Sequence, residues 1–303
     1  MRKSDFVTDM ALDVLERQSL ESLADVKKLQ CGIVRKMVKV RDEELARRTG
    51  KPKGIYLTYD CPPSALSSEK GFRALAGYIA GALVELAGVM GRRSLVLVAG
   101  LGNSDVTADS LGGRVAEFLD VSPVAASARE REKVRLCAVR TGVEGRTGVR
   151  SADAVAGLCM KLKPSCVIAV DSLVTSVPGR IGTSFQLTTA GIAPGSGVGG
   201  ERARLDRESL GVPVIAVGVP TVLAMRTVLY DTVKGYAART AAALNEFALR
   251  ELIAESKLGS LVVAPKEIGW QVEAAAAAVA GGINIAFGEN YPKSRLTLPN
   301  FIH

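Results

Sequence analysis

Residues 94–113, SLVLVAGLGNSDVTADSLGG, and residues 165–176, SCVIAVDSLVTS, decide the fold. Each segment opens with an uninterrupted apolar run of strand length, and an aspartate follows that run, Asp109 in the first segment and Asp171 in the second. Such a run between helices is typical of a central strand that is covered on both faces. Because ligand sites of open α/β sheets lie beyond the carboxyl ends of the strands, we expect both aspartates at the same edge of one sheet.

The flanking sequence alternates between helix and strand patterns. Residues 67–91 predict a long helix, because apolar positions recur every three or four residues and Ser67 or Ser68 can cap its start. A second helix is expected to begin near Thr107 and run to Leu119, and a third is expected at 153–163 with Ser151 as its cap. Residues 222–253 are expected to form one helix or two. A last helix is expected to begin at Pro265 and to end at Gly281 and Gly282. Further strands are expected at 31–40, 54–58, 166–170, 213–219 and 261–263.

This alternation predicts a single α/β domain over residues 1–303, a three-layer sandwich with a mostly parallel central sheet covered by helices. The strands at 31–40 and 54–58 are expected to form a hairpin or an edge of that sheet. Residues 125–133 and 183–207 lack a clear periodic pattern, so they are predicted to be loops.

Composition excludes several classes of protein. The chain has no apolar stretch of membrane-spanning length and no signal peptide, and its five cysteines form no C-x-x-C pair. We therefore expect a cytoplasmic protein with reduced thiols, Cys159 and Cys166 among them in the core. The net charge of +8 is spread thinly among interleaved acids and accompanies no nucleic-acid-binding motif, so neither nucleic acid nor membrane is an expected partner.

The only histidine is the last residue, His303. A terminal histidine is a poor organiser of a Ser-His-Asp or Cys-His site, so in a hydrolase carboxylates should carry the proton transfers. Asp109 and Asp171 are the candidates. Each also has a structural interpretation, Asp109 as a first-turn residue that opposes the helix dipole and Asp171 as a strand-end cap.

Other polar residues near these segments are expected to be structural. Asn103 and Asp105 are rival acids or orienting groups on the Asp109 loop, Glu267 beside Lys266 suits the start of the last helix, and Asn284 reads as a hydrogen-bonded buried group.

Four blocks in a fixed order carry a family resemblance: GLGNSDVTADSLGG, VIAVDSLVTS, GIAPGSGVGG followed by LGVPVIAVGVPTV, and APKEI with AGGINIAF. Together they resemble the germination protease of spore-forming bacteria over most of the chain from about Leu95 to Phe287. VTDMALD, at residues 7–13, is similar to the opening of the mature enzyme in that family. Six residues precede this motif, so a removable propeptide would be very short.

The resemblance implies an endopeptidase that cleaves small acid-soluble spore proteins during germination in the cytoplasm of the spore core. It further implies a fold related to hydrogenase-maturation peptidases, a homo-tetramer made as a zymogen, no cofactor and no metal, and Asp109 with Asp171 as the catalytic pair. Where the family commonly has proline before the first aspartate, this chain has Ala108, which alters loop stiffness and not chemistry.

Two carboxyl groups that share a water predict a mechanism. One should be protonated and polarise the scissile carbonyl, while the ionised one takes a proton from the attacking water. The glycine-rich segment, through Gly195, Ser196, Gly197 and Gly199, could supply an oxyanion site or bind the substrate chain, because glycine lets main chain approach closely.

Two alternatives stay open at this point. A metal-dependent maturation-type peptidase would want a histidine ligand, and the chain offers only His303. A non-catalytic relative of the same fold would instead use the glycine-rich loop to hold a ligand or partner, with both aspartates structural.

Overall fold

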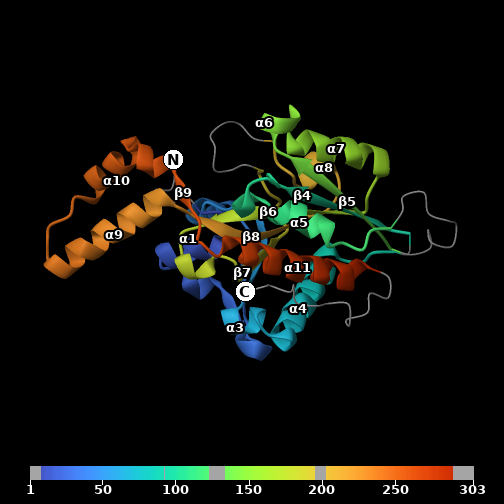
Figure 1. Ribbon diagram of the computed structural model, residues 1–303, viewed down its shortest axis with the longest axis horizontal. Helices are drawn as coiled ribbons and strands as arrows, with labels where there is room; N and C mark the ends of the chain where they lie inside the picture. The colour runs from blue at the N-terminus through green and yellow to red at the C-terminus, as the bar shows by residue number, and fades with distance from the viewer. Residues whose placement is uncertain (1–7, 92, 123–133, 195–202, 289–303) are drawn as a thin grey trace.

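The computed structural model describes residues 8–91, 93–122, 134–194 and 203–288 (Figure 1). Its strands are β1 (Asp25–Lys28), β2 (Val34–Val40), β3 (Gly54–Asp60), β4 (Leu95–Leu101), β5 (Arg135–Gly142), β6 (Cys166–Thr175), β7 (Ser184–Thr188), β8 (Val214–Ala224) and β9 (Val262–Val263). Its α-helices are α1 (Ala11–Arg17), α2 (Glu43–Thr49), α3 (Pro63–Leu66), α4 (Glu69–Ala87), α5 (Leu111–Glu117), α6 (Glu144–Thr147), α7 (Ser151–Leu162), α8 (Arg207–Leu210), α9 (Met225–Thr240), α10 (Glu246–Glu255) and α11 (Ile268–Phe287). Short 3-10 turns are η1 (Glu21–Leu23), η2 (Gln30–Gly32), η3 (Thr107–Asp109), η5 (Pro178–Arg180) and η6 (Lys257–Ser260).

Within these residues the strands form one sheet in the order β1-β2-β3-β7-β8-β6-β4-β5, with β9 beside β8. The four strands β8, β6, β4 and β5 are parallel, and β1, β2, β3 and β7 extend the sheet with antiparallel pairs. Because β7 is antiparallel to both β8 and β3, β3 points the same way as the four parallel strands. Because β2 is antiparallel to both β3 and β1, β1 also points that way. The predicted α/β sandwich is confirmed, and the N-terminal strands form the predicted edge.

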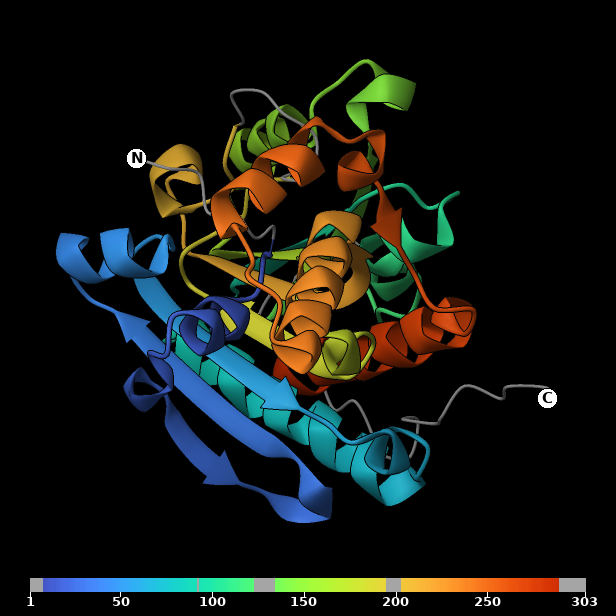
Figure 2. The ribbon, with the colours of Figure 1, turned by 90° about the vertical axis from the view of Figure 1, so that its left-hand side faces the viewer.

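Helices cover both faces of the sheet, so it is the middle of three layers (Figure 1). On one face α4, α5 and α11 bury the main core, in which Phe72, Leu75 and Val98 are fully inaccessible. On the other face α7 and α8 cover the parallel strands, while α1 and α2 cover the antiparallel ones. In Figure 2 the blue N-terminal strands lie in front of the long teal helix α4.

The predicted cap of α4 is confirmed, since the Ser68 hydroxyl accepts a hydrogen bond from the Gly71 N–H at 3.2 Å. The cap predicted for Ser151 is wrong. Arg150 is the N-cap of α7, and the Ser151 hydroxyl instead donates to the Gly142 carbonyl. The segment predicted as one helix or two is a strand end followed by two helices, because β8 continues to Ala224 before α9 begins.

Two further predictions are wrong for packing reasons. Residues 183–207 are not one loop, because 184–188 form β7 between β3 and β8. Its polar residues, such as Gln186, are buried together with its apolar ones. Gly281 and Gly282 do not stop the last helix, since α11 runs through them to Phe287. A Cβ on Gly282 would lie 2.5 Å from the Ile79 side chain, so glycine here lets α4 and α11 pack closely.

Residues 125–133, predicted to be a loop, lie outside the described residues, as does His303. No helix of the described part of the chain has the length and apolar character needed to cross a membrane.

Candidate functional site

Asp171 is the sixth of the ten residues of β6, directly after five fully or almost fully buried apolar residues, so the strand predicted to end at Val170 continues to Thr175. Pairing between β6 and β4 ends at Val170, so the strand edge that faced β4 changes partner at this point. The Ser172 N–H at this edge donates to the Asp171 carboxylate at 2.9 Å. The Asp171 side chain is only 8% exposed. The sheet therefore holds a buried carboxyl group where one of its parallel pairs ends.

Asp109 lies on the turn η3, which follows the end of β4 at Leu101. Its Oδ2 accepts a hydrogen bond from the Asn103 N–H at 2.8 Å, so the loop folds back on the carboxylate. Gly102 has φ +91°, and a Cβ there would lie 2.8 Å from Oδ1 of Asp109. The glycine of the GLGN motif is required by this close approach. The helix predicted from Thr107 is the short η3 followed by α5, which ends at Glu117, two residues before the predicted Leu119.

Close packing of α5 brings the Asp109 turn to the middle of β6. A Cβ on Gly112, in the first turn of α5, would lie 2.5 Å from the Val170 carbonyl oxygen and would also collide with the backbone of Leu101. Only a residue without a side chain lets the start of α5 contact both β4 and β6 there. This packing places the helix that follows the Asp109 turn against Val170, the residue before Asp171.

The charge of Asp109 acts on the carboxyl group of Asp171. Burial raises the pKa of Asp171 well above its ordinary value, and the negative charges of Asp109 and Asp9 raise it further, against the hydrogen bond from Ser172. Burial also raises the pKa of Asp109, and the Asn103 N–H opposes that shift. Asp171 is thus the group of the pair that more strongly favours its protonated form.

A pocket of about 270 Å³ opens beside Asp171. It lies over β6, β7 and β8, on the face of the sheet where α1 and α2 give way to α7 and α8. Its polar lining includes Asp9, Lys51, Tyr56, Gln186 and Arg204. A peptide side chain or a turn of main chain is of a size that such a pocket accepts.

Described residues on both sides of the glycine-rich segment line this pocket. Ala193 and Arg204, on either side of the segment, both line the pocket. Gly195, Ser196, Gly197 and Gly199 lie outside the described residues, so their role stays a prediction.

The other polar residues have structural partners. Asp105 forms an ion pair with Arg146, and the Asn103 side-chain oxygen accepts from the Asp105 N–H. Asn284 is buried and bonds the Asp120 N–H and the Phe118 carbonyl, as predicted. Glu267 is the N-cap of α11. Cys159 and Cys166 are buried free thiols, which confirms their prediction.

The N-terminal segment is the part of the site that sequence reasoning missed. The Asp9 N–H donates to the Val174 carbonyl at 2.9 Å, and Oδ2 of Asp9 accepts from the Val174 N–H at 2.8 Å. The half-buried Lys51 ammonium donates to the carbonyls of Thr8 and Asp9, each at 3.0 Å. VTDMALD carried the available signal, since it holds two acids within an otherwise apolar motif.

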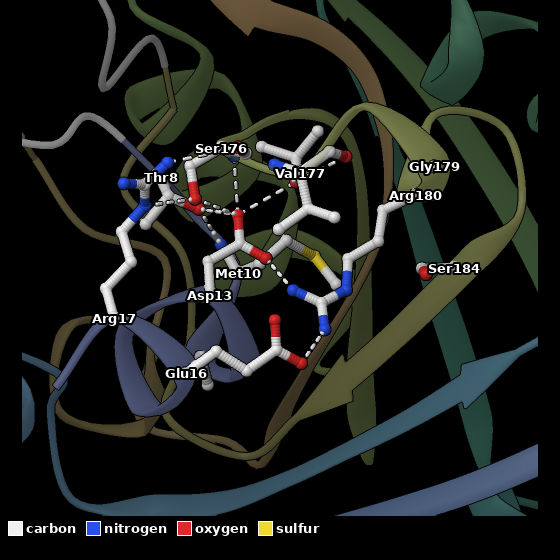
Figure 3. A network of polar contacts seen from close by, with 12 residues as sticks. Thr8, Met10, Asp13, Glu16, Arg17, Ser176, Val177, Gly179, Arg180 and Ser184 are labelled. Carbon is white, nitrogen blue, oxygen red and sulfur yellow. Dashed lines mark hydrogen bonds and ion pairs between the residues drawn. The ribbon is translucent and has the colours of Figure 1, made fainter. Parts of the chain in front are cut away.

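Figure 3 shows how this segment is anchored. Asp13 is fully buried and forms an ion pair with Arg180, whose guanidinium also pairs with Glu16. Oδ2 of Asp13 accepts further bonds from the Ser176 N–H at 2.6 Å and the Thr175 hydroxyl at 2.8 Å. Burial raises the pKa of Asp13, but these bonds and the Arg180 charge outweigh it, so the net direction is down. The N-terminal segment is therefore fixed to the end of β6.

Across the four described ranges, no three His, Cys, Asp or Glu side chains gather as metal ligands would. The fold and these contacts define an α/β protein in which a buried carboxyl group, Asp171, lines a pocket over the middle strands of the sheet, and the charge of a second carboxyl group, Asp109, raises its pKa.

Comparison with known proteins identifies the family of this chain. The chain belongs to the germination protease family, whose sequence profile matches residues 13–246, and it is a peptidase. It is 34% identical over 302 aligned residues to the germination protease of Caldanaerobacter subterraneus subsp. tengcongensis, covering 92% of this chain and 93% of that protein. It is 33% identical to the germination protease of Clostridium acetobutylicum, covering 82% of this chain and 83% of that protein.

Among solved structures, the chain is similar to a [NiFe] hydrogenase maturation protease, HycI from Thermococcus kodakarensis. The identity is 20% and the TM-score 0.31, with 57% of this chain and 97% of that chain covered.

Proposed function

We propose that this chain hydrolyses small acid-soluble spore proteins during spore germination, with Asp109 and Asp171 as the catalytic pair. The observation that carries the proposal is that Asp171, a buried carboxyl group that lines a pocket, has a raised pKa to which the charge of the half-buried Asp109 contributes. Family membership supports peptide hydrolysis in germination. The resemblance of the sequence blocks supports the substrate class.

The difference between the two environments assigns the roles within this proposal. Asp109, the more accessible group, is ionised and takes a proton from water as the water oxygen bonds to the scissile carbonyl carbon. Asp171, the more buried group, is protonated, polarises that carbonyl and gives its proton to the nitrogen as the C–N bond breaks. Asp109 then carries the proton from water and Asp171 is ionised. Transfer of that proton to Asp171 restores the pair.

The glycine-rich segment completes the proposed site. Main-chain N–H groups of Gly195, Ser196, Gly197 and Gly199 bind the substrate chain or the developing oxyanion. The support is positional, since the residues that flank the segment line the pocket beside Asp171.

The proposal extends to assembly and location. The chain acts as one peptidase domain, as a homo-tetramer made as a zymogen, in the cytoplasm of the spore core. A single sheet that includes strands from β1 to β9 supports the single domain. The arm formed by α9 and α10 projects from the body and exposes Tyr236, Phe247 and Leu252, which supports assembly with further copies (Figure 1).

Incubation of the purified chain with a small acid-soluble spore protein, followed by mass spectrometry of the fragments, tests the activity. We expect discrete internal cleavages that persist in a chelator, because the mechanism uses two carboxyl groups. Intact substrate would contradict the proposed substrate class. Loss of cleavage in the chelator would favour a metal-dependent peptidase.

A further inference from the structure

One edge of β6 carries two carboxylates, and the mechanism above uses only one of them. Beyond Val170, where β4 stops pairing, the Ser172 N–H donates to Asp171 and the Val174 N–H donates to Asp9. N–H groups two residues apart on one edge of a strand are about 7 Å apart. The Asp9 carboxylate is therefore a neighbour of Asp171 on the same strand edge.

Several hydrogen bonds hold Asp9 and its neighbours in place. Its N–H and its carboxylate both bond to Val174, so Asp9 continues the edge that β4 leaves. Its carbonyl accepts from the Lys51 ammonium, and the Ala11 N–H donates to Gln186 of β7 at 2.8 Å. Asp9 and Asp171 line the same pocket.

We propose that Asp9 is a positioning residue of the peptidase, whose negative charge keeps the neighbouring Asp171 carboxyl protonated and therefore able to donate a proton to the leaving nitrogen. The inference rests on the proposed roles of Asp109 and Asp171. It adds a third carboxylate that never touches the reacting atoms.

Other charged groups also lie near Asp171. Asp109 adds a second negative charge from η3, and Lys51 and Arg204 add positive charges at the pocket wall. Arg204 is held by Asp206 at 2.9 Å, and the Tyr56 hydroxyl bonds the Pro52 carbonyl. Burial lowers the pKa of Lys51, against the charges of Asp9 and Asp13. Burial is the largest cause of the raised pKa of Asp171, and the charges of Asp109 and then Asp9 add to it, in the direction that the proposed role of Asp9 requires.

The test is the pH dependence of kcat for Asp9→Asn with a peptide from a small acid-soluble spore protein. Asparagine keeps an oxygen that can accept from the Val174 N–H and removes the charge. The alkaline limb of the profile, which reports loss of the proton from Asp171, should move about one pH unit to the acid side. Asp9→Glu should restore the limb at least in part, because it returns the charge.

Asp153→Asn is the matched control, since Asp153 is an exposed acid on α7 paired with Arg150. It changes the net charge equally and should leave the profile in place. An unshifted alkaline limb in folded Asp9→Asn would overturn the inference while leaving the catalytic pair intact. Inactivity of the wild-type chain on every peptide would overturn the proposed function itself.

A second variant covers the case in which Asp9→Asn does not fold. Lys51→Met removes a positive charge that opposes Asp9 and should move the alkaline limb to higher pH. No movement, or movement in the opposite direction, would contradict the electrostatic role of the N-terminal segment.

Discussion

Gly112 at the start of α5 lies so near the Val170 carbonyl oxygen that an added Cβ would stand 2.5 Å from it. This contact sets the distance between the Asp109 turn and the middle of β6, where Asp171 follows Val170. The geometry of the proposed catalytic pair thus depends on a residue that has no side chain.

We expect Gly112→Ala to separate the pair. The added methyl group must push α5 away from β4 and β6, at a cost of about 1–3 kcal/mol in the free energy of unfolding. Cleavage should fall as well, because the carboxyl groups move apart. Chemical denaturation and peptide assays measure the two effects. Gly81→Ala in α4 is the control. Its Cβ would meet nothing within 4 Å, so it should stabilise the protein by about 0.5–1 kcal/mol without loss of activity.

Asp109→Asn and Asp171→Asn should each fold and lose peptide cleavage by orders of magnitude, because each removes one member of the proton relay. Asp105→Asn is the matched control on the same loop, since Asp105 is exposed and pairs with Arg146. It should retain nearly full kcat/KM. Turnover like that of the wild type in either of the first two variants would exclude the proposed pair.

The same pair predicts how stability depends on pH. The pKa of Asp171 is raised in the folded state, so folding binds a proton and the free energy of unfolding decreases as the pH rises above the unfolded pKa near 3.8. Asp171→Asn cannot ionise in either state. Its Tm should therefore exceed that of the wild type at pH 7, and the difference should shrink toward pH 4. A Tm difference that grows on acidification would show the opposite sign of the shift.

Arg180 and Asp13 make the buried ion pair that anchors the N-terminal segment. Arg180→Met leaves the Asp13 charge buried without its guanidinium, which typically costs about 3–5 kcal/mol. Because the pKa of Asp13 is lowered by folding, the stabilisation it gives is present above its unfolded pKa and is lost as the pH falls below that value. Urea denaturation at pH 7 and at pH 3 tests both statements. Lys53→Met, which breaks the exposed pair with Glu43, should change little.

The α9–α10 arm gives a prediction about assembly. Phe247 is 61% exposed, and Phe247→Asp should weaken association of copies by placing a charge in the buried contact. Light scattering after size exclusion should report a smaller species than for the wild type. Met160→Asp replaces an even more exposed apolar residue on α7 and should leave the mass unchanged. Equal masses for wild type and Phe247→Asp would remove this arm from the interface.

Much of the fold could be read from local patterns. The apolar run at 95–101 and the helix capped by Ser68 were predictable because burial on two faces and helical periodicity leave a direct mark on sequence. The strand β7 was missed although Ser184, Gln186 and Thr188 alternate with apolar residues as in a strand. Only the structure shows that these polar residues are themselves buried in hydrogen-bonded positions. The helix end predicted at Gly282 was wrong, because this glycine lets α4 pack closely against α11 and does not end α11.

The candidate site was predictable only in part. Asp109 and Asp171 could be picked out because each follows an uninterrupted run of apolar residues in the sequence. Asp9 and Lys51 gave no such sign, since a short acidic motif and a surface-like lysine become neighbours of Asp171 only when the chain has folded.

Sequence alone determined the class of fold, the two acidic segments and the family, because these depend on local periodicity and on motifs that are contiguous in the chain. The tertiary structure alone decided which carboxyl group is the more buried, which third acid stands beside it, and how the N-terminal segment is fixed. Those properties depend on solvent exclusion and on distances between segments more than 150 residues apart, such as Asp9 and Val174. No local pattern encodes such distances.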